Sequence, residues 1–216
     1  MKIIKPYYEI MTKIDREEIL KSIEVIGRTC YKSESKITDD SSSKFVKTLI
    51  DRGHEAMIEH IYITVKYVCD RGVTHEIVRH RLANYAQEST RYCNYSQEKF
   101  GNEITVIEPF FFNNEYEDGV GYIDSKYYHW KDSCEWAEYA YFSLLKLGAT
   151  PQEARSVLPN SLKTEIVVTM NLRELRHFFK LRTAKTAHPQ MREITIPLLI
   201  ELKGLLPEIF NDITIE

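Results

Sequence analysis

The hydrophobic pattern changes its period within the first third of the chain, and this change constrains the fold more than any other feature. From Asp15 onward apolar residues recur every three or four positions, and Glu18 follows as the partner in a capping box, which predicts a helix. Between Ile61 and Tyr67 apolar and polar residues alternate instead, which predicts a half-buried strand. The chain must therefore combine helices with a sheet.

Elements of both kinds continue to the end of the chain. The same patterns predict helices over residues 41–53, 73–82, 125–147 and 190–205, helix starts at Thr150 and Asn171, and strands over residues 104–107 and 165–170. Pro197 is expected to interrupt the last helix, and residues 109–124 are expected to form a loop. Because no regular β-α-β rhythm is present, we expect an α+β fold, a single mixed domain over residues 1–216 with helices packed on a central sheet.

Composition narrows the class of protein. With 216 residues the chain can bury one sizeable core, and its formal net charge of -3 leaves no large basic field of the kind that binds nucleic acid. The four cysteines stand far apart without a C-x-x-C pair, which is typical of a reducing compartment. No apolar stretch approaches the roughly 20 residues of a membrane span. We expect a soluble cytoplasmic protein without nucleic-acid or membrane partners.

One segment, residues 67–98, carries arginine but no lysine. Its arginines are Arg71, Arg79, Arg81 and Arg91. The guanidinium group is a planar fork of donors that fits phosphate or carboxylate in a bidentate way, so a lysine-free cluster indicates a site for an oriented anion such as a phosphorylated metabolite. The alternative is that these arginines form structural ion pairs with Asp70, Glu76 and Glu88.

Three common ligand-binding motifs are missing from the sequence. Gly119 and Gly121 lack the third glycine of a dinucleotide fingerprint, and no P-loop is present. His54 and Glu55 begin like a zinc-binding H-E-x-x-H motif, but Ile58 stands where the second histidine is required. We therefore expect no metal site.

Four motifs together resemble one enzyme family. Arg79-His80-Arg81, followed after seven residues by Ser89, is similar to the signature of the flavin-dependent thymidylate synthases, the ThyX family. Three further stretches agree with that family in the same order. They are GHEAMIEH at residues 53–60, ARSVLPNSL at residues 154–162 and TMNLRELRHFFKLR at residues 169–182.

The resemblance implies a reaction that composition and spacing do not disclose. It implies reductive methylation of dUMP to dTMP, with methylenetetrahydrofolate as the one-carbon donor and NADPH as the reductant of a bound FAD. It also implies a homotetramer in which three subunits contribute to each active site. No local motif indicates the flavin, which is inferred from the resemblance alone.

The resemblance also implies roles for individual positions. Those matching flavin-binding positions are His54, Arg79, His80, Arg81, Gln87, Asn171, Leu172, Arg173 and His177. Those matching dUMP-binding positions are Glu76, Arg79, Gln87, Glu88, Ser89, Thr90, Arg91, Arg155 and Arg182. Among these, Arg91 is expected to bind the phosphate. Glu76 departs from the glutamine common in the family, so its contact is expected to be a sugar hydroxyl or Arg79.

Arg182 matches the residue that activates the uracil ring, and its chemistry limits how it can act. A guanidinium stays protonated in proteins, so Arg182 must stabilise negative charge on the ring rather than remove a proton. The family needs no enzyme nucleophile, and we expect Ser89 to donate a hydrogen bond and Cys93 to pack as a small residue. His80 lies between two arginines, which favours its neutral form.

Two other classes of function remain open from the sequence. One is a catalytically inactive nucleotide- and flavin-binding protein on the same scaffold. The other is a polynucleotide-binding protein that uses the Arg79-His80-Arg81 segment, although the acidic balance of the chain disfavours it.

Overall fold

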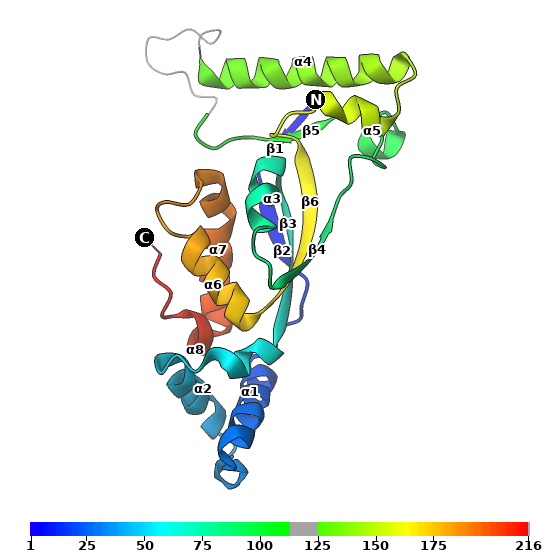
Figure 1. The fold of residues 1–216 in the computed structure, drawn as a ribbon. Coiled ribbons are helices and arrows are strands. Elements are labelled where there is room, and N and C mark those ends of the chain that lie inside the picture. Colours follow the sequence, from blue (N-terminus) through cyan, green and yellow to red (C-terminus); the bar gives the residue numbers. More distant parts are fainter. Residues whose placement is uncertain (113–124, 216) are drawn as a thin grey trace. The chain divides into compact units, whose positions relative to one another are not determined.

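The computed structural model describes residues 1–112 and 125–215, and it is shown in Figure 1. The predicted loop over residues 109–124 therefore lies, from residue 113 onward, outside the described residues. The chain divides into two compact units. The first unit comprises Met1–Tyr7, Tyr67–Ile77 and Ala86–Ile166, and the second comprises Tyr8–Lys66, Val78–Tyr85 and Val167–Glu216. The single domain expected over the whole chain stays a prediction.

A four-stranded sheet has the strand order β2-β3-β6-β4. Its strands are β2 (Tyr7–Ile10), β3 (Tyr62–Asp70), β6 (Lys163–Asn171) and β4 (Ala83–Gln87). The alternation predicted for β3 is confirmed, since Ile63, Val65 and Tyr67 are buried. The alternating burial of β6 follows the same period of two, as expected for strands with one face on a core. The α+β class is confirmed.

The first unit builds its core around a small parallel sheet. β1 (Lys2–Ile4) pairs with β5 (Thr105–Ile107), with Lys2 opposite Thr105. The other elements of this unit are α3 (Arg71–Ile77), the 3-10 turn η3 (Glu98–Phe100), α4 (Lys126–Lys146), α5 (Pro151–Ala154) and the 3-10 turn η5 (Arg155–Val157). Val106, Tyr141 and Leu162 belong to one buried cluster of this unit. The predicted strand over residues 104–107 and the helix over residues 125–147 are thus confirmed.

The second unit is mainly helical. Its elements are α1 (Arg16–Tyr31), the 3-10 turns η1 (Glu34–Lys36) and η2 (Glu55–His60), α2 (Ser41–Asp51), α6 (Leu172–Arg182), α7 (Pro189–Leu205) and α8 (Pro207–Phe210). Phe179 packs between Phe178 and Phe210, with ring centroids 5.5 and 5.9 Å apart. Gly27 of α1 lets the Phe45 ring of α2 approach closely, because a Cβ at Gly27 would lie 2.6 Å from Phe45 Cε1.

The predicted end of one helix is wrong. The helix expected over residues 73–82 ends at Ile77, and Val78 and Leu82 are 40% and 71% exposed rather than turned to the core. The chain forms a turn there and enters β4 at Ala83, a strand that the sequence pattern did not indicate. The Arg79-His80-Arg81 segment consequently follows the helix instead of ending it.

The expected interruption at Pro197 is also wrong, because α7 continues through it. An internal proline costs roughly 3 kcal/mol, but Ile194 and Leu198 are buried on either side of it, and burying two such side chains offsets this cost. Within residues 1–112 and 125–215, no helix is long and apolar enough to span a bilayer.

Candidate active site

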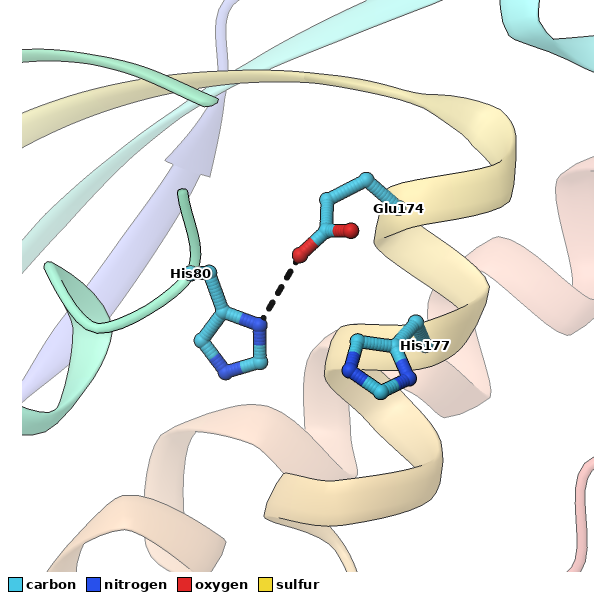
Figure 2. A group of neighbouring side chains, drawn as sticks. All are labelled: His80, Glu174 and His177. Carbon is cyan, nitrogen blue, oxygen red and sulfur yellow. Dashed lines mark hydrogen bonds and ion pairs between the residues drawn. The ribbon is translucent and has the colours of Figure 1, made fainter. Parts of the chain in front are cut away.

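His80 is the most constrained of the predicted site residues. It belongs to the second unit and lies just after α3, with its side chain buried to 5% exposure. Its Nδ1 atom lies 3.0 Å from Oε1 of Glu174. Figure 2 marks this contact with a dashed line. Glu174 stands in the first turn of α6, where its backbone N–H donates to Oδ1 of Asn171 at 2.8 Å. A carboxylate is favoured at this helix end by the helix dipole.

The other ring nitrogen of His80 fixes the tautomer. Nε of Arg182, the last residue of α6, donates to Nε2 of His80 at 3.1 Å. Because a guanidinium can only donate, Nε2 must carry the lone pair, and Nδ1–H must donate to the carboxylate of Glu174. His80 is therefore a neutral imidazole in this arrangement.

The electrostatics agree with this neutral form. Burial lowers the pKa of His80, and the hydrogen bond to Glu174 opposes that effect while the nearby charge of Arg182 reinforces it. The neutral histidine expected from the sequence is thus confirmed, but the cause differs. Arg79 and Arg81 are both exposed, so burial and Arg182 are responsible.

Further contacts hold the His80 ring in place. The Tyr85 hydroxyl donates to the backbone carbonyl of His80. Burial raises the pKa of Tyr85 to about 12, so this hydroxyl stays a donor. The Phe178 ring packs edge-on against the imidazole with centroids 5.0 Å apart. His80 thus connects the segment after α3 to both ends of α6.

A cavity of about 540 Å³ lies beside this cluster in the second unit. It is lined by Glu55, Glu59, Leu82, Asn171, Arg173, Glu174, His177 and Lys180. Three predicted flavin positions, Asn171, Arg173 and His177, are brought together here. Arg173 is held by ion pairs with Glu59 and Glu55.

The remaining flavin positions of this unit differ in accessibility. His54, Arg79 and Arg81 are exposed, and His54 immediately precedes η2. Leu172 is fully buried, and its backbone N–H donates to the carbonyl of Ile61 at 2.9 Å.

His80, Glu174 and His177 also have the spacing of a metal-binding group. One ligand atom from each lies within 4.8 Å of the others (Figure 2). Coordination by Nδ1 of His80 requires a lone pair on that atom and places the proton on Nε2, against the donor Nε of Arg182. The Arg182 contact therefore favours a hydrogen-bonded cluster over a metal centre.

In the first unit, two predicted nucleotide positions have their side chains engaged by the protein. Gln87 Nε2 donates to the hydroxyls of Thr74 and Thr164 at 3.0 and 3.3 Å. Glu88 accepts hydrogen bonds from Lys163 and Tyr95 at 3.0 and 3.2 Å. The proposed nucleotide contacts of Gln87 and Glu88 stay predictions.

The next residues form a tight turn with available cationic groups. Ser89 Oγ accepts from the backbone N–H of Arg91 at 3.3 Å. Thr90 is buried, and its hydroxyl accepts from Nη1 of Arg155 at 3.3 Å. Both Arg91 and Arg155 are exposed. Glu76 is half-buried on α3.

The ion-pair alternative for the arginine cluster fails for Arg79, Arg81 and Arg91. Arg79, Arg81 and Arg91, and likewise Arg155, have no ion pair with a carboxylate among the residues that the structure describes. Instead, Asp70 accepts from the N–H of Val73 at 2.7 Å, and Glu88 binds Lys163. These exposed guanidinium groups are available to an anionic ligand.

Neither candidate nucleophile is activated. Burial raises the pKa of the Cys93 thiol, and Cys93 packs against the buried cluster of the first unit, as expected for a small packing residue. Ser89 accepts a backbone N–H and has no hydrogen bond to a histidine within the described chain.

The predicted contacts divide between the two units. All flavin positions except Gln87 belong to the second unit, and all nucleotide positions except Arg79 and Arg182 belong to the first. Glu174 was missed by the sequence analysis. Its signal was the Glu-x-x-His spacing to His177, which places both side chains on one face of a helix.

Comparisons with known proteins give one consistent result. The family model described as thymidylate synthase complementing protein matches residues 14–208. A flavin-dependent thymidylate synthase of Geobacter sulfurreducens is 29% identical over 198 residues, which cover 88% of this chain and 80% of that relative. A protein of the same name from Pyrococcus furiosus is 33% identical over 177 residues, which cover 82% of this chain and 68% of that relative.

A solved structure shows the same fold. The crystal structure of a UMP/dUMP methylase PolB from Streptomyces cacaoi bound with 5-Br dUMP matches with a TM-score of 0.75 and 19% identity. The match covers 98% of this chain and 96% of that one.

Proposed function

Because the chain belongs to the family described as thymidylate synthase complementing protein, we propose that it is a flavin-dependent thymidylate synthase. Its reaction is the reductive methylation of dUMP to dTMP, with methylenetetrahydrofolate and NADPH as co-substrates and FAD as cofactor. The observation that carries this proposal is the extent of the family match, since residues 14–208 include every candidate site residue from His54 to Arg182.

The electron balance of this reaction requires a two-electron reductant. The methylene carbon of the folate becomes the methyl group on C5 of the uracil, and C5 loses its proton. Reduction from methylene to methyl requires two electrons, which NADPH provides as a hydride, so the folate leaves as tetrahydrofolate. The products are dTMP, tetrahydrofolate and NADP⁺.

The donor set of the second unit fits a flavin dinucleotide. Lys180 places positive charge in the 540 Å³ cavity, where Arg173 is paired with Glu55 and Glu59. Leu82 gives the cavity an apolar surface, and exposed Arg79 and Arg81 can bind a pyrophosphate. FAD, when bound and reduced, supplies the hydride for the reaction.

In the first unit, the residues best suited to bind the nucleotide phosphate are Arg91 and Arg155. Neither is engaged by a carboxylate among the described residues, and the hydroxyls of Ser89 and Thr90 lie on the same turn. A charge-assisted hydrogen bond contributes roughly 1.5–3 kcal/mol, so two or three such bonds would hold a phosphomonoester.

Arg182 is the residue we propose for activating the uracil ring. Its guanidinium can stabilise negative charge that develops on the ring nitrogen and oxygens, which polarises the C5–C6 bond. The bond from Arg182 Nε to His80 Nε2 holds this group in one orientation before substrate binds.

Assembly and location complete the proposal. A homotetramer would allow residues of several subunits to form one site, and light scattering would measure its mass. A cytoplasmic location fits the four cysteines, which are all free thiols.

The direct test is an assay of the purified protein with FAD, dUMP, NADPH and methylenetetrahydrofolate. We expect dTMP by mass spectrometry, and no dTMP when either FAD or NADPH is omitted. Binding of dUMP and FAD without formation of dTMP would instead favour a catalytically inactive nucleotide- and flavin-binding protein.

A further inference from the structure

We propose that Glu174 is a positioning residue, which acts through His80 to set the direction of the Arg182 guanidinium. This inference rests on the proposed role of Arg182 in activating the uracil ring. It concerns the pairing Glu174–His80–Arg182, in which one imidazole connects a carboxylate to a guanidinium.

The geometry requires an intermediary between the two ends of α6. Glu174 and Arg182 stand eight residues apart on the same helix, which corresponds to about 12 Å along its axis. His80 enters from the segment after α3, and the side chains of Glu174 and Arg182 both reach its ring. Nδ1 lies 3.0 Å from Glu174 Oε1, and Nε2 lies 3.1 Å from Arg182 Nε. Figure 2 shows the Glu174 carboxylate turned toward this ring.

The hydrogen-bonding roles of the two partners determine which ring nitrogen of His80 carries the proton. The carboxylate of Glu174 accepts only, so it holds the proton of the imidazole on Nδ1. That leaves the Nε2 lone pair for Arg182 Nε–H. If the proton moved to Nε2, two donors would face each other and Arg182 would have to rotate away.

The surroundings leave His80 little freedom. Its ring and the Glu174 side chain are buried, and the ionisable groups that face the ring are Glu174, His177 and Arg182 from α6 together with Tyr85 from β4. The Asn171 cap holds the backbone of Glu174 in place at the start of α6. Glu174 is thus fixed before any ligand arrives.

Glu174→Gln is the sharpest variant, because it keeps the size of the side chain but replaces the carboxylate with an amide that can also donate to Nδ1. Its matched control is Glu18→Gln. Glu18 occupies the same position of α1, where its N–H donates to the capping Asp15, and it has no contact with His80.

The first readout is structural and independent of activity. In the unmodified protein, NMR of the His80 ring should report the Nδ1–H tautomer, and the Arg182 Nε–H should give a resonance protected from exchange. In Glu174→Gln the Nε2–H tautomer should appear and this protection should be lost, whereas Glu18→Gln should match the unmodified protein. An Nε2–H tautomer in the unmodified protein would overturn the inference even if the variant did not fold.

The second readout is kinetic. Glu174→Gln should lower kcat by about 10-fold or more, with the dUMP dissociation constant nearly unchanged. Unchanged kcat and an unchanged His80 tautomer would contradict the inference. Failure of the unmodified protein to form dTMP would overturn the proposed function instead, and the Arg182 resonance would still decide whether Glu174 controls that side chain.

Discussion

Arg182 Nε lies 3.1 Å from the Nε2 atom of His80, so the final residue of α6 is aligned by a buried neutral imidazole. An arginine side chain is flexible, and fixing it before the substrate binds reduces the reorganisation that its charge requires during the reaction. The contact therefore gives a physical reason why a histidine is needed between Arg79 and Arg81.

Replacement of Arg182 should affect turnover more than binding. Arg182→Ala removes a charge that we propose stabilises the developing anion, and loss of one such group typically lowers kcat by about 10²–10³-fold. The dUMP dissociation constant should change by only about 3-fold, since the proposed phosphate contacts are Arg91 and Arg155. Steady-state kinetics and calorimetry measure the two effects. The control is Arg52→Ala, which removes an exposed arginine outside the site. Equal losses of dUMP binding and turnover in Arg182→Ala would exclude the proposed role of Arg182.

Replacement of Arg91 should have the opposite profile. Arg91→Ala removes a proposed phosphate contact, so dUMP binding should weaken by about 1.5–3 kcal/mol, while kcat at saturating dUMP stays close to that of the unmodified enzyme. Lys146→Ala removes another exposed cation of the first unit and should leave dUMP affinity unchanged. Calorimetric titration with dUMP and with deoxyuridine, which lacks the phosphate, gives the check. Arg91→Ala should weaken the binding of dUMP and leave the binding of deoxyuridine unchanged.

Acid stability should depend on the C-terminal segment. Arg176 donates to both carboxylate oxygens of Asp212 at 2.6 and 2.7 Å, and this hydrogen bonding lowers the pKa of Asp212 below its usual value of 3.8. A lowered folded-state pKa means that the stabilisation is present above pH 3.8 and is lost as pH falls through the lower, folded-state pKa.

Asp212→Asn should therefore reduce the free energy of unfolding at pH 7 by about 1–3 kcal/mol. The difference between the two proteins should shrink as the pH falls below 3.8, the ordinary pKa of the carboxyl. Urea denaturation from pH 3 to pH 7 measures this difference. If the difference in free energy of unfolding did not depend on pH, the pairing of Asp212 with Arg176 would not be the source of the stabilisation.

The contribution of helix capping to stability can be tested by comparing Asp15 with Asp40. Asp15 accepts from the N–H of Glu18 at 3.1 Å and caps α1, whereas Asp40 precedes α2 without a side-chain capping bond. Asp15→Ala should cost about 0.5–2 kcal/mol, and Asp40→Ala should cost clearly less. Chemical denaturation gives both values, and equal costs would contradict the assigned caps.

Much of the secondary structure was predictable because its signals are local. Asp15, Ser125 and Asn171 each accept a hydrogen bond from the N–H three residues onward, and each marks the start of a helix that the sequence indicated. The alternation within β3 and β6 likewise follows from which side chains are buried.

The parts that escaped prediction depend on non-local contacts. Val78 and Leu82 continued a helical pattern, but the chain leaves the helix after Ile77 and both side chains are exposed. β1 and β4 are too short or too polar to show a period. The resemblance indicated His80 and Arg182 separately, but the pairing of His80 with Glu174 joins residues 94 positions apart and no local pattern encodes it.

The most direct test of the proposed activity is the stoichiometry of the reductant. During turnover by the purified enzyme, the amounts of dTMP, oxidised NADPH and folate products should be measured together. The account predicts one NADPH oxidised for each dTMP formed, with tetrahydrofolate as the folate product. Absence of dTMP, or dTMP formed together with dihydrofolate and without NADPH oxidation, would contradict it.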